Sequence, residues 1–303
     1  MPDIPKPLLA NRLLLAYLGL LVATPLWGYL PVFLVENFYG LLFALNLFPD
    51  FPYLPEPLVW DLRYEWGSIV ALAVFLGFLA RRYLPRYRES LGLFPGTFRE
   101  VLELFLFVLA YKMLVGDFML WLFPTDPFPS LPFGPAATTP AGWVGYAIAA
   151  ILLAPLVEEI LFRGFLLRAY AAARGPRFAL YAQAALFSLF HMHPLHMLES
   201  FGFAWILGRS VLARSSLIPA IAVHALMNAL VLAKILLVPA NPQPTSVLGV
   251  WAGVFILLML WAIVRRFPLP KTPPEAPGSV LSGSLVLVLL HFLAYYVWLF
   301  LWR

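Results

Sequence analysis

The sequence is a series of apolar runs, each long enough or nearly long enough to cross a bilayer as a helix. A spanning helix needs about 20 mostly apolar residues. Eight or nine candidates lie near residues 13–34, 67–80, 99–123, 142–173, 178–193, 195–213, 216–238, 246–264 and 279–301. The run at 67–80 is short unless Trp66 and its neighbours extend it, and a further segment, 37–48, is short enough to be re-entrant or interfacial. The sequence therefore predicts an all-α, polytopic transmembrane helix bundle.

The composition agrees with a membrane protein and excludes several kinds of chemistry. Hydrophobic residues make up 62% of the chain and charged residues only 12%, against about 25% charged in soluble domains. The chain has 10 tryptophans, 13 tyrosines and 26 phenylalanines, as expected for aromatic belts at the two membrane interfaces. It has no cysteine, which excludes disulfides, thiolate zinc sites and cysteine nucleophiles. No large soluble domain is expected.

The basic residues predict the orientation and argue against a nucleic-acid partner. The net charge of +5 comes from short clusters between apolar runs, which is the pattern of cytoplasmic loops. Clusters occur at Lys6/Arg12, Arg81/Arg82/Arg86/Arg88, Arg168/Arg174/Arg177, Arg209/Arg214 and Arg265/Arg266/Lys271. These clusters alternate with loops that carry no basic residue, and the alternation matches a chain that crosses the membrane nine times. We therefore expect an inner or plasma membrane protein with a cytoplasmic N-terminus and an external C-terminus.

Two adjacent carboxylates, Glu158 and Glu159, interrupt one of the apolar runs, and Arg163 follows them. A charged side chain near a bilayer centre is costly, so its default interpretation is a functional site. Glu159 and Arg163 are four residues apart and share a helix face, in the favourable order for an ion pair. Glu158 lies roughly 100° around the helix, with no lysine or arginine one turn away. Pro155 would kink the helix one turn before the carboxylates.

Two further runs contain polar residues at one-turn spacing. His191 follows Phe187 by four residues, and Asn228 follows His224 by four residues. A Glu–His pair can hold and deprotonate a water molecule, and imidazole and amide groups can donate hydrogen bonds to an oxyanion. Each feature alone has a structural alternative, because Glu159–Arg163 can lock two helices and His or Asn can bond across membrane helices. Their joint occurrence predicts an active site for amide hydrolysis.

The three motifs EExxxR, FxxxH and HxxxN, on successive membrane helices, resemble the CPBP family of intramembrane proteases, also called Abi. This family includes the type II CAAX prenyl endopeptidases. The similarity extends from about Trp143 to Leu232 and includes the stretch FGFAWILGRSVLARSSLIPAIAVHALMN. The predicted division of the chain follows from it: a motif-free part at 1–141, a catalytic membrane core at 142–238 and C-terminal membrane helices at 239–303.

The resemblance implies a role for each motif residue. Glu158 and His191 would activate the attacking water, and His224 and Asn228 would form the oxyanion hole. Glu159 and Arg163 would support the site, with Arg163 fixing the carboxylates or binding a substrate C-terminus. Zinc, held by Glu158, His191 and His224, stays an alternative. The chain has no HExxH, however, and Arg163 disfavours a nearby dication, so a metal-free mechanism without a cofactor is expected.

The sequence therefore predicts an intramembrane endopeptidase that hydrolyses a peptide bond in a membrane-anchored protein or peptide entering from lipid. Two alternatives stay open. One is a non-catalytic membrane immunity or scaffold protein, and the other is an ion or metal transporter that uses the buried carboxylates and histidines. Other polar residues are weaker candidates. Lys112 and Asp117 could pair with each other or line the cavity, and Gln183 and Ser188 could line the cavity or bond to neighbouring backbone. His193 and His196 could bind metal but are expected to be interface residues, Glu199 could gate or orient but is expected to be a solvated carboxylate at a loop end, and His291 is isolated in the last helix.

Overall fold

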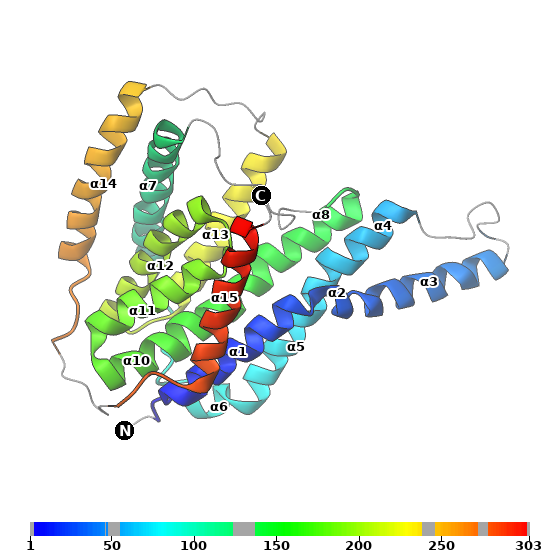
Figure 1. The fold of residues 1–303 in the computed structure, drawn as a ribbon, viewed down its shortest axis with the longest axis horizontal. Helices are drawn as coiled ribbons and strands as arrows, with labels where there is room; N and C mark the ends of the chain where they lie inside the picture. Colours follow the sequence, from blue (N-terminus) through cyan, green and yellow to red (C-terminus); the bar gives the residue numbers. More distant parts are fainter. Residues whose placement is uncertain are drawn as a thin grey trace. The chain divides into compact units, whose positions relative to one another are not determined.

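Helices joined by short irregular segments make up the residues that the computed structural model describes, which are 3–45, 47, 55–123, 137–237, 246–271 and 278–301 (Figure 1). No strand occurs among them. The prediction of an all-α helix bundle is therefore confirmed. By their internal contacts the residues divide into two compact units, and the proposed site lies wholly within the first of them. The three-part division of the chain predicted from its motifs stays a prediction.

The second unit comprises Ala16–Leu84 and Leu131–Val157. Its helices are α2 (Thr24–Trp27), α3 (Tyr29–Ala44), α4 (Glu56–Asp61), η1 (Leu62–Trp66), α5 (Gly67–Arg82), α8 (Pro140–Ala147) and η2 (Ile148–Leu153), where η denotes a π-helical segment. Segments α4, η1 and α5 follow one another without a break. The predicted span at 67–80 is therefore extended past Trp66 to Glu56.

The first unit comprises Met1–Leu15, Pro85–Ser130 and Glu158–Arg303. Its helices are α7 (Phe98–Leu122), η3 (Glu159–Leu166), α10 (Leu167–Arg174), α11 (Pro176–Leu189), α12 (Pro194–Arg214), α13 (Ile218–Leu237), α14 (Ser246–Arg266) and α15 (Gly283–Leu301). Helices α1 (Pro7–Val22), α6 (Leu84–Tyr87) and α9 (Ala154–Glu158) contain the points at which the chain passes between the units. Helix α12 packs against both α11 and α7, and α14 packs along α7.

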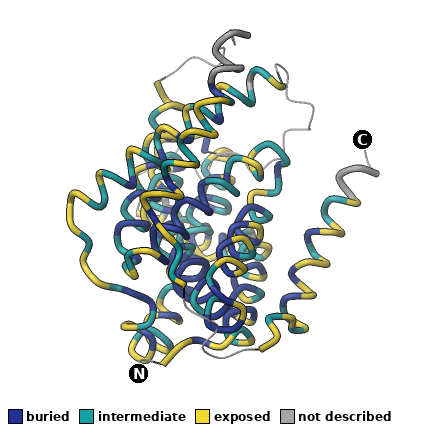
Figure 2. Tube along the Cα trace, turned by 90° about the vertical axis from the view of Figure 1, so that its left-hand side faces the viewer, coloured by how far each residue is buried: buried dark blue, intermediate teal, exposed yellow. Residues whose placement is uncertain are grey.

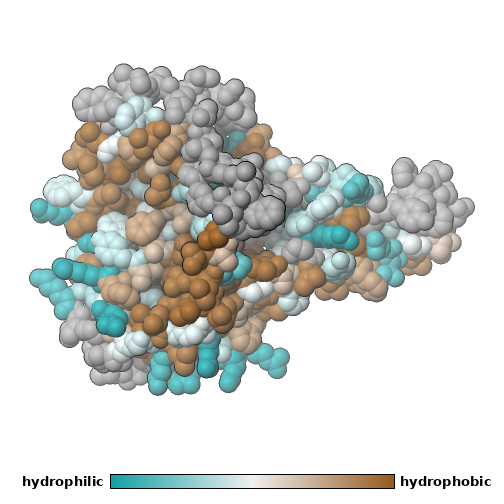
Figure 3. Space-filling model, in the orientation of Figure 1, coloured by the Kyte–Doolittle hydropathy of each residue, from teal (hydrophilic) through white to brown (hydrophobic). Residues whose placement is uncertain are grey.

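Three of the helices are long and apolar enough to cross a membrane: Glu56–Arg82, Pro140–Arg174 and Ile218–Leu237. Shorter apolar helices occur at Pro7–Val22, Tyr29–Leu42 and Gly283–Val297. Large apolar side chains also cover much of the outer surface (Figure 3); examples are Leu257, Trp261 and Leu293, each at least 60% exposed. Exposed apolar surface of this extent marks contact with lipid or with another protein, and together with the long apolar helices it indicates an integral membrane protein.

The first predicted span, 13–34, is wrong in its bounds. The chain instead forms α1, the short α2 and then α3, which also contains most of the segment expected to be re-entrant. Pro25 stands in the first turn of α2. Because proline has no backbone N–H, it cannot donate the hydrogen bond that would continue the preceding helix. At the α2–α3 junction, a Cβ on Gly28 would overlap with the backbone of Arg63 in η1. The break therefore comes from a proline and from a close approach that only glycine allows.

The run that contains the carboxylates forms one long helix, from α8 through η2, α9 and η3 to α10. Pro155 cannot donate a hydrogen bond to the carbonyl four residues before it. The π-helical segment η2 ends at Leu153, two residues before this proline, and its i→i+5 hydrogen bonds change the backbone geometry there. A second π-helical segment, η3, begins at Glu159. π-Helical turns inside α-helices are frequent at functional sites.

Local signals set the ends of the helices that frame the site. The Thr97 side chain accepts a hydrogen bond from the backbone N–H of Glu100, whose carboxylate accepts one from the backbone N–H of Thr97. This reciprocal capping box starts α7. Between α10 and α11, Gly175 has a φ of +87° and is followed by Pro176. Glycine adopts this φ without steric cost, and proline suits the first helical turn.

Most helices of the protein bury one face and expose the other (Figure 2). The segment η3 is different, because all eight of its residues are buried, including Glu159 and Arg163. Gly164 in η3 lies against Leu91, and the Phe165 ring packs edge-on against Tyr87. At the end of α10, the Tyr170 hydroxyl donates a hydrogen bond to Asn11 Oδ1 at 2.5 Å. Glu159 is thus located on a fully buried segment of the first unit, directly after Glu158 at the end of α9.

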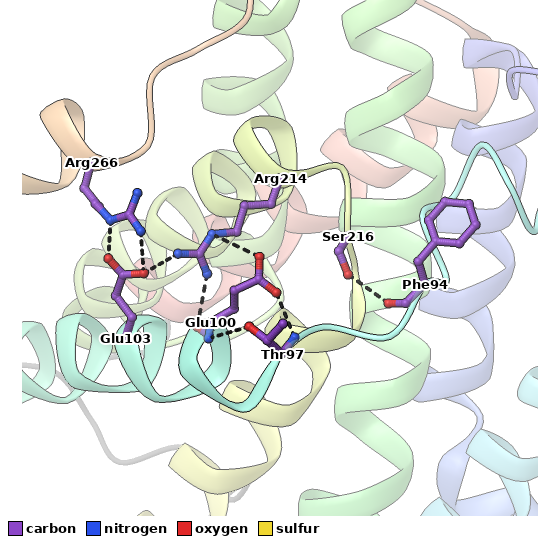
Figure 4. A network of polar contacts seen from close by, with 7 residues as sticks. All are labelled: Phe94, Thr97, Glu100, Glu103, Arg214, Ser216 and Arg266. Atoms are coloured by element: carbon purple, nitrogen blue, oxygen red, sulfur yellow. Dashed lines mark hydrogen bonds and ion pairs between the residues drawn. The ribbon is translucent and has the colours of Figure 1, made fainter.

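A charged network joins α7, α12 and α14 at one end of the first unit (Figure 4). The Glu103 carboxylate accepts hydrogen bonds from both Arg214 and Arg266. Arg214 Nη1 also donates to the backbone carbonyl of Glu100 at 3.1 Å. The Arg214 and Glu103 side chains are 11% and 24% exposed. One carboxylate therefore holds three helix ends together.

Replacing Glu103 with glutamine is expected to destabilise the protein by about 1–2 kcal/mol, because an uncharged amide can replace only part of two charge-assisted hydrogen bonds. The measurement is thermal unfolding of the purified protein in detergent. Asp3→Asn is the control, since the Asp3–Arg86 pair is more than half exposed on both sides and such pairs contribute little. Equal melting temperatures for the two variants would contradict the expectation.

Candidate active site

The centre of the site is a buried contact between η3 and α13. Glu159 Oε1 lies 2.8 Å from His224 Nδ1 and 3.0 Å from Arg163 Nη1. The side chains of Glu159 and Arg163 are fully buried, and that of His224 is 5% exposed. A carboxylate can only accept, so His224 Nδ1 carries the proton in this hydrogen bond. The ion pair expected from one-turn spacing is present, and the same oxygen also binds a histidine 65 residues away.

Glu158 approaches the opposite nitrogen of the same imidazole. Glu158 Oε2 lies 3.9 Å from His224 Nε2, and the Glu158 side chain is 21% exposed. At this distance there is no direct hydrogen bond, but a single bridging water could contact both atoms. The two adjacent carboxylates therefore face different sides of one ring: Glu159 is enclosed and Glu158 is partly open.

Arg163 is held by electrostatic contacts in a fully buried position. Its guanidinium lies over the Phe187 ring, with the Cζ atom 4.2 Å from the ring centroid. None of its three nitrogens has a hydrogen-bond partner among the described residues. A buried cation that lacks full hydrogen bonding is costly to desolvate. The charged guanidinium is then stabilised mainly by the neighbouring carboxylate and the aromatic face. Arg163 and Glu159 therefore need each other to remain charged in this place.

Two phenylalanines enclose the His224 ring. Phe187 from α11 and Phe203 from α12 both meet it edge-on, with ring centroids 6.0 Å and 5.1 Å from the imidazole centroid. These contacts exclude water from the Glu159 side of the ring and limit its rotation. Phe187 belongs to the FxxxH motif, four residues before His191, so the sequence could indicate that it lies at the site. Phe203 was missed, because nothing local in the sequence distinguishes it from an ordinary core aromatic.

His191 lies just beyond the end of α11 and not within it, as α11 ends at Leu189. Its side chain is exposed, and Nδ1 is 3.3 Å from the backbone carbonyl of Phe187. That carbonyl can only accept, so Nδ1 carries the proton and Nε2 is left as the basic nitrogen. The next residue, Met192, has a φ of +54°, a left-handed conformation that costs a non-glycine residue roughly 1–2 kcal/mol. Backbone strain of this kind often occurs at active sites.

His191 and His224 are connected through one aromatic ring, since the Phe187 centroid is 5.0 Å from the His191 imidazole. Asn228 follows His224 by one turn of α13 and is half-buried. Residues four apart lie on one face of a helix, so the amide and the imidazole share a face. The structure thus gathers Glu158, Glu159, Arg163 and His224 by direct contact, His191 through Phe187, and Asn228 by helix register.

The residues proposed as alternative zinc ligands do not form a metal site in this structure. Within the part of the chain that the structure describes, no three His, Asp or Glu side chains are grouped so that they could hold a metal ion. Glu159 Oε1 is already shared by Arg163 and His224. A dication beside that guanidinium would be repelled. Of the alternative set, Glu158 and His224 lie 3.9 Å apart, and both His191 and His224 pack against the Phe187 ring.

Two of the weaker candidates bond to neighbouring backbone. Gln183 Nε2 donates to the carbonyls of Leu180 and Ala204 at 3.2 Å and 3.0 Å, which joins α11 to α12. Ser188 Oγ donates to the carbonyl of Ala185 at 2.8 Å. Both contacts agree with the structural alternative that the sequence left open for these residues.

The remaining candidates lie around the start of α12 or on helices outside the motifs. Lys112 does not pair with Asp117, as the sequence had suggested, but with Glu199, which is half-buried in α12 and not on a solvated loop. The rings of His193 and His196 are 5.0 Å apart. His291 packs against Phe292 in α15. The spacing on α7 suggested the wrong partner because the true one comes from a different helix.

One family model matches the segment that contains this geometry. Residues 140–230 match the model described as "Type II CAAX prenyl endopeptidase Rce1-like". The match begins at α8, ends within α13 and includes all three motifs, which confirms the predicted resemblance over this segment. No curated protein and no solved structure matches the chain. The segment that contains the motifs is therefore similar to that endopeptidase family.

Proposed function

We propose that this protein is an intramembrane endopeptidase that hydrolyses a peptide bond in a membrane-anchored protein or peptide. One observation carries the proposal: the two carboxylates of η3 and α9 meet opposite nitrogens of a single imidazole from α13. This contact joins the first and third motifs within the segment that matches the endopeptidase family. A structural ion pair would account for Glu159 and Arg163, but it would not require a second carboxylate at the opposite nitrogen of His224.

The proposed reaction begins with water held by Glu158 and His191. One of them takes a proton from the water as its oxygen attacks the carbonyl carbon of the scissile bond, which gives a tetrahedral oxyanion. The proton is then passed to the departing amine as the C–N bond breaks. Glu158 is partly open and His191 is exposed, so water can reach both, which supports this assignment.

His224 and Asn228 are the proposed donors to the oxyanion. An imidazole that already gives its Nδ1 proton to Glu159 can donate through Nε2 only when that nitrogen is protonated as well. Two carboxylates flank the ring. Glu159 then has a positioning role, because it fixes the ring orientation, and Arg163 neutralises Glu159.

We propose that the reaction needs no metal. Purified protein is expected to keep its activity within about twofold after exhaustive treatment with a zinc chelator, since general acid–base groups and oxyanion donors supply the chemistry. Metal content is measured by mass spectrometry on the same sample. A loss of activity on chelation that added zinc restores would contradict the proposal.

The proposed substrate enters laterally from lipid, because the carboxylates lie within an apolar spanning helix. The family description makes a prenylated C-terminus the first choice of substrate, and an unlipidated membrane peptide is the second. The proposed orientation has the N-terminus in the cytoplasm and the C-terminus outside, in an inner or plasma membrane. This orientation follows from the positions of the basic clusters.

The test is peptide cleavage by the purified protein in liposomes. The substrate is a quenched fluorescent peptide with an S-farnesyl cysteine three residues before its C-terminal residue, and a matched peptide carries an unmodified serine at that position. Cleavage of the first alone supports a prenyl endopeptidase, and cleavage of a membrane-spanning peptide without lipid supports a broader intramembrane protease. No cleavage of any of these, together with ion flux across the liposome, would favour the transporter alternative instead.

A further inference from the structure

A half-buried ion pair beside the site connects α7 to α12. Lys112 Nζ lies 2.6 Å from Glu199 Oε1, and both side chains are 24% exposed. The hydroxyl of the adjacent Tyr111 donates to the backbone carbonyl of Glu199 at 3.0 Å. Two successive residues of α7 therefore bind the same residue of α12. Helix α7 lies outside the segment that matches the family model, so no motif predicts this contact.

The two helices approach one another very closely at this point. A Cβ added to Gly202 would overlap with the hydroxyl and ring of Tyr111. Any larger residue at position 202 would therefore push α12 away from α7 and separate Lys112 from Glu199. The ion pair, the tyrosine hydrogen bond and the glycine contact all lie within the first three turns of α12, which begins at Pro194.

These turns of α12 are directly connected to two residues of the proposed site. The His191 turn ends where α12 begins, and it passes through the strained backbone of Met192. Farther along α12, the Phe203 ring lies 5.9 Å from Lys112 Nζ and 5.1 Å from the His224 ring. A shift of α12 would therefore move the His191 turn at one end and the wall of the His224 pocket at the other.

We infer that the Lys112–Glu199 pair is a positioning device for the active site: it holds the start of α12 so that His191 and His224 keep their reactive orientations. The inference rests on the proposed function, because it assigns these two histidines a role in catalysis. Half-buried charge pairs are screened less than exposed ones, and Tyr111 orients the backbone that carries Glu199. Neither Lys112 nor Glu199 is assigned a contact with the substrate.

The first test is kinetic. Lys112→Met and Glu199→Gln are each expected to lower kcat by about 10- to 100-fold, the range that follows from a small misplacement of reacting groups, with KM within about twofold. The double variant Lys112→Glu/Glu199→Lys restores the opposite charges and is expected to recover most of kcat. Arg86→Met, which breaks an exposed ion pair in the same unit, is the control and is expected to match the wild type.

The second test reads the position of α12 without using activity. The chain has no cysteine, so Leu198→Cys offers one site for a nitroxide spin label, on a side chain that is 56% exposed. The electron paramagnetic resonance spectrum is expected to show a restrained label in the otherwise wild-type protein. Lys112→Met is expected to make the label more mobile, and the charge-swapped double variant is expected to restrain it again.

Three results would overturn the inference: an unchanged label mobility in Lys112→Met, a failure of the charge swap to restore kcat, or a raised KM with normal kcat. The last result would make Lys112 a substrate-binding residue instead. A different result would contradict the proposed function. If no peptide is cleaved by the wild type while the spin label still responds to Lys112→Met, the pair holds α12 but the site has another use.

Discussion

Replacing Glu158 with glutamine is expected to lower kcat by about 10³-fold, the usual contribution of a general base. Glutamine has nearly the same shape but cannot take a proton from water. Glu158 is the partly open carboxylate of the pair and lies 3.9 Å from His224 Nε2, so its loss should leave the buried Glu159–His224 contact in place. The measurement is peptide cleavage in liposomes, with thermal unfolding as a check that the variant is folded.

Glu89→Gln is the matched control for this prediction, because Glu89 is an exposed glutamate of the same unit and is expected to leave kcat unchanged. A folded Glu158→Gln protein with at least a third of wild-type activity would eliminate Glu158 as the base. In cells, the inactive variant is expected to accumulate uncleaved membrane precursors, and comparative proteomics of that strain would identify the natural substrate.

Replacing Arg163 with methionine is expected to destabilise the protein by about 3–5 kcal/mol, because it leaves the Glu159 carboxylate buried without its cation. Both side chains are fully buried, so water cannot compensate for the loss. The double variant Arg163→Met/Glu159→Gln removes the uncompensated charge and is expected to be more stable than Arg163→Met alone. The measurement is unfolding of each purified variant in detergent.

Arg86→Met serves as the control for this series, since Arg86 is 66% exposed and such exposed pairs contribute little to stability. If the double variant were less stable than Arg163→Met, the charge of Glu159 would have another compensating partner. The double variant is expected to be inactive in either case, because glutamine in place of Glu159 loses the charged acceptor that fixes the orientation of the His224 ring.

The positions of the six motif residues could be read from the sequence, but their contacts could be read only in part. The Glu159–Arg163 pair was predictable because both residues lie on one helix, one turn apart. The contact of Glu159 with His224 was not predictable, since the two residues are 65 positions apart. No local rule decides which faces of two distant helices pack against each other. The expected pairing of Lys112 with Asp117 failed for the same reason.

Sequence alone determined the membrane character, the helical class and the order of the motif residues, because hydrophobic length and one-turn spacing are local properties of the chain. Only the tertiary structure decided that Glu158 and Glu159 address opposite nitrogens of one imidazole, that two phenylalanines enclose it, and that η2 and η3 are π-helical. These features depend on how helices pack against each other. Packing is set by the fit of many side chains at once, which no single stretch of sequence contains.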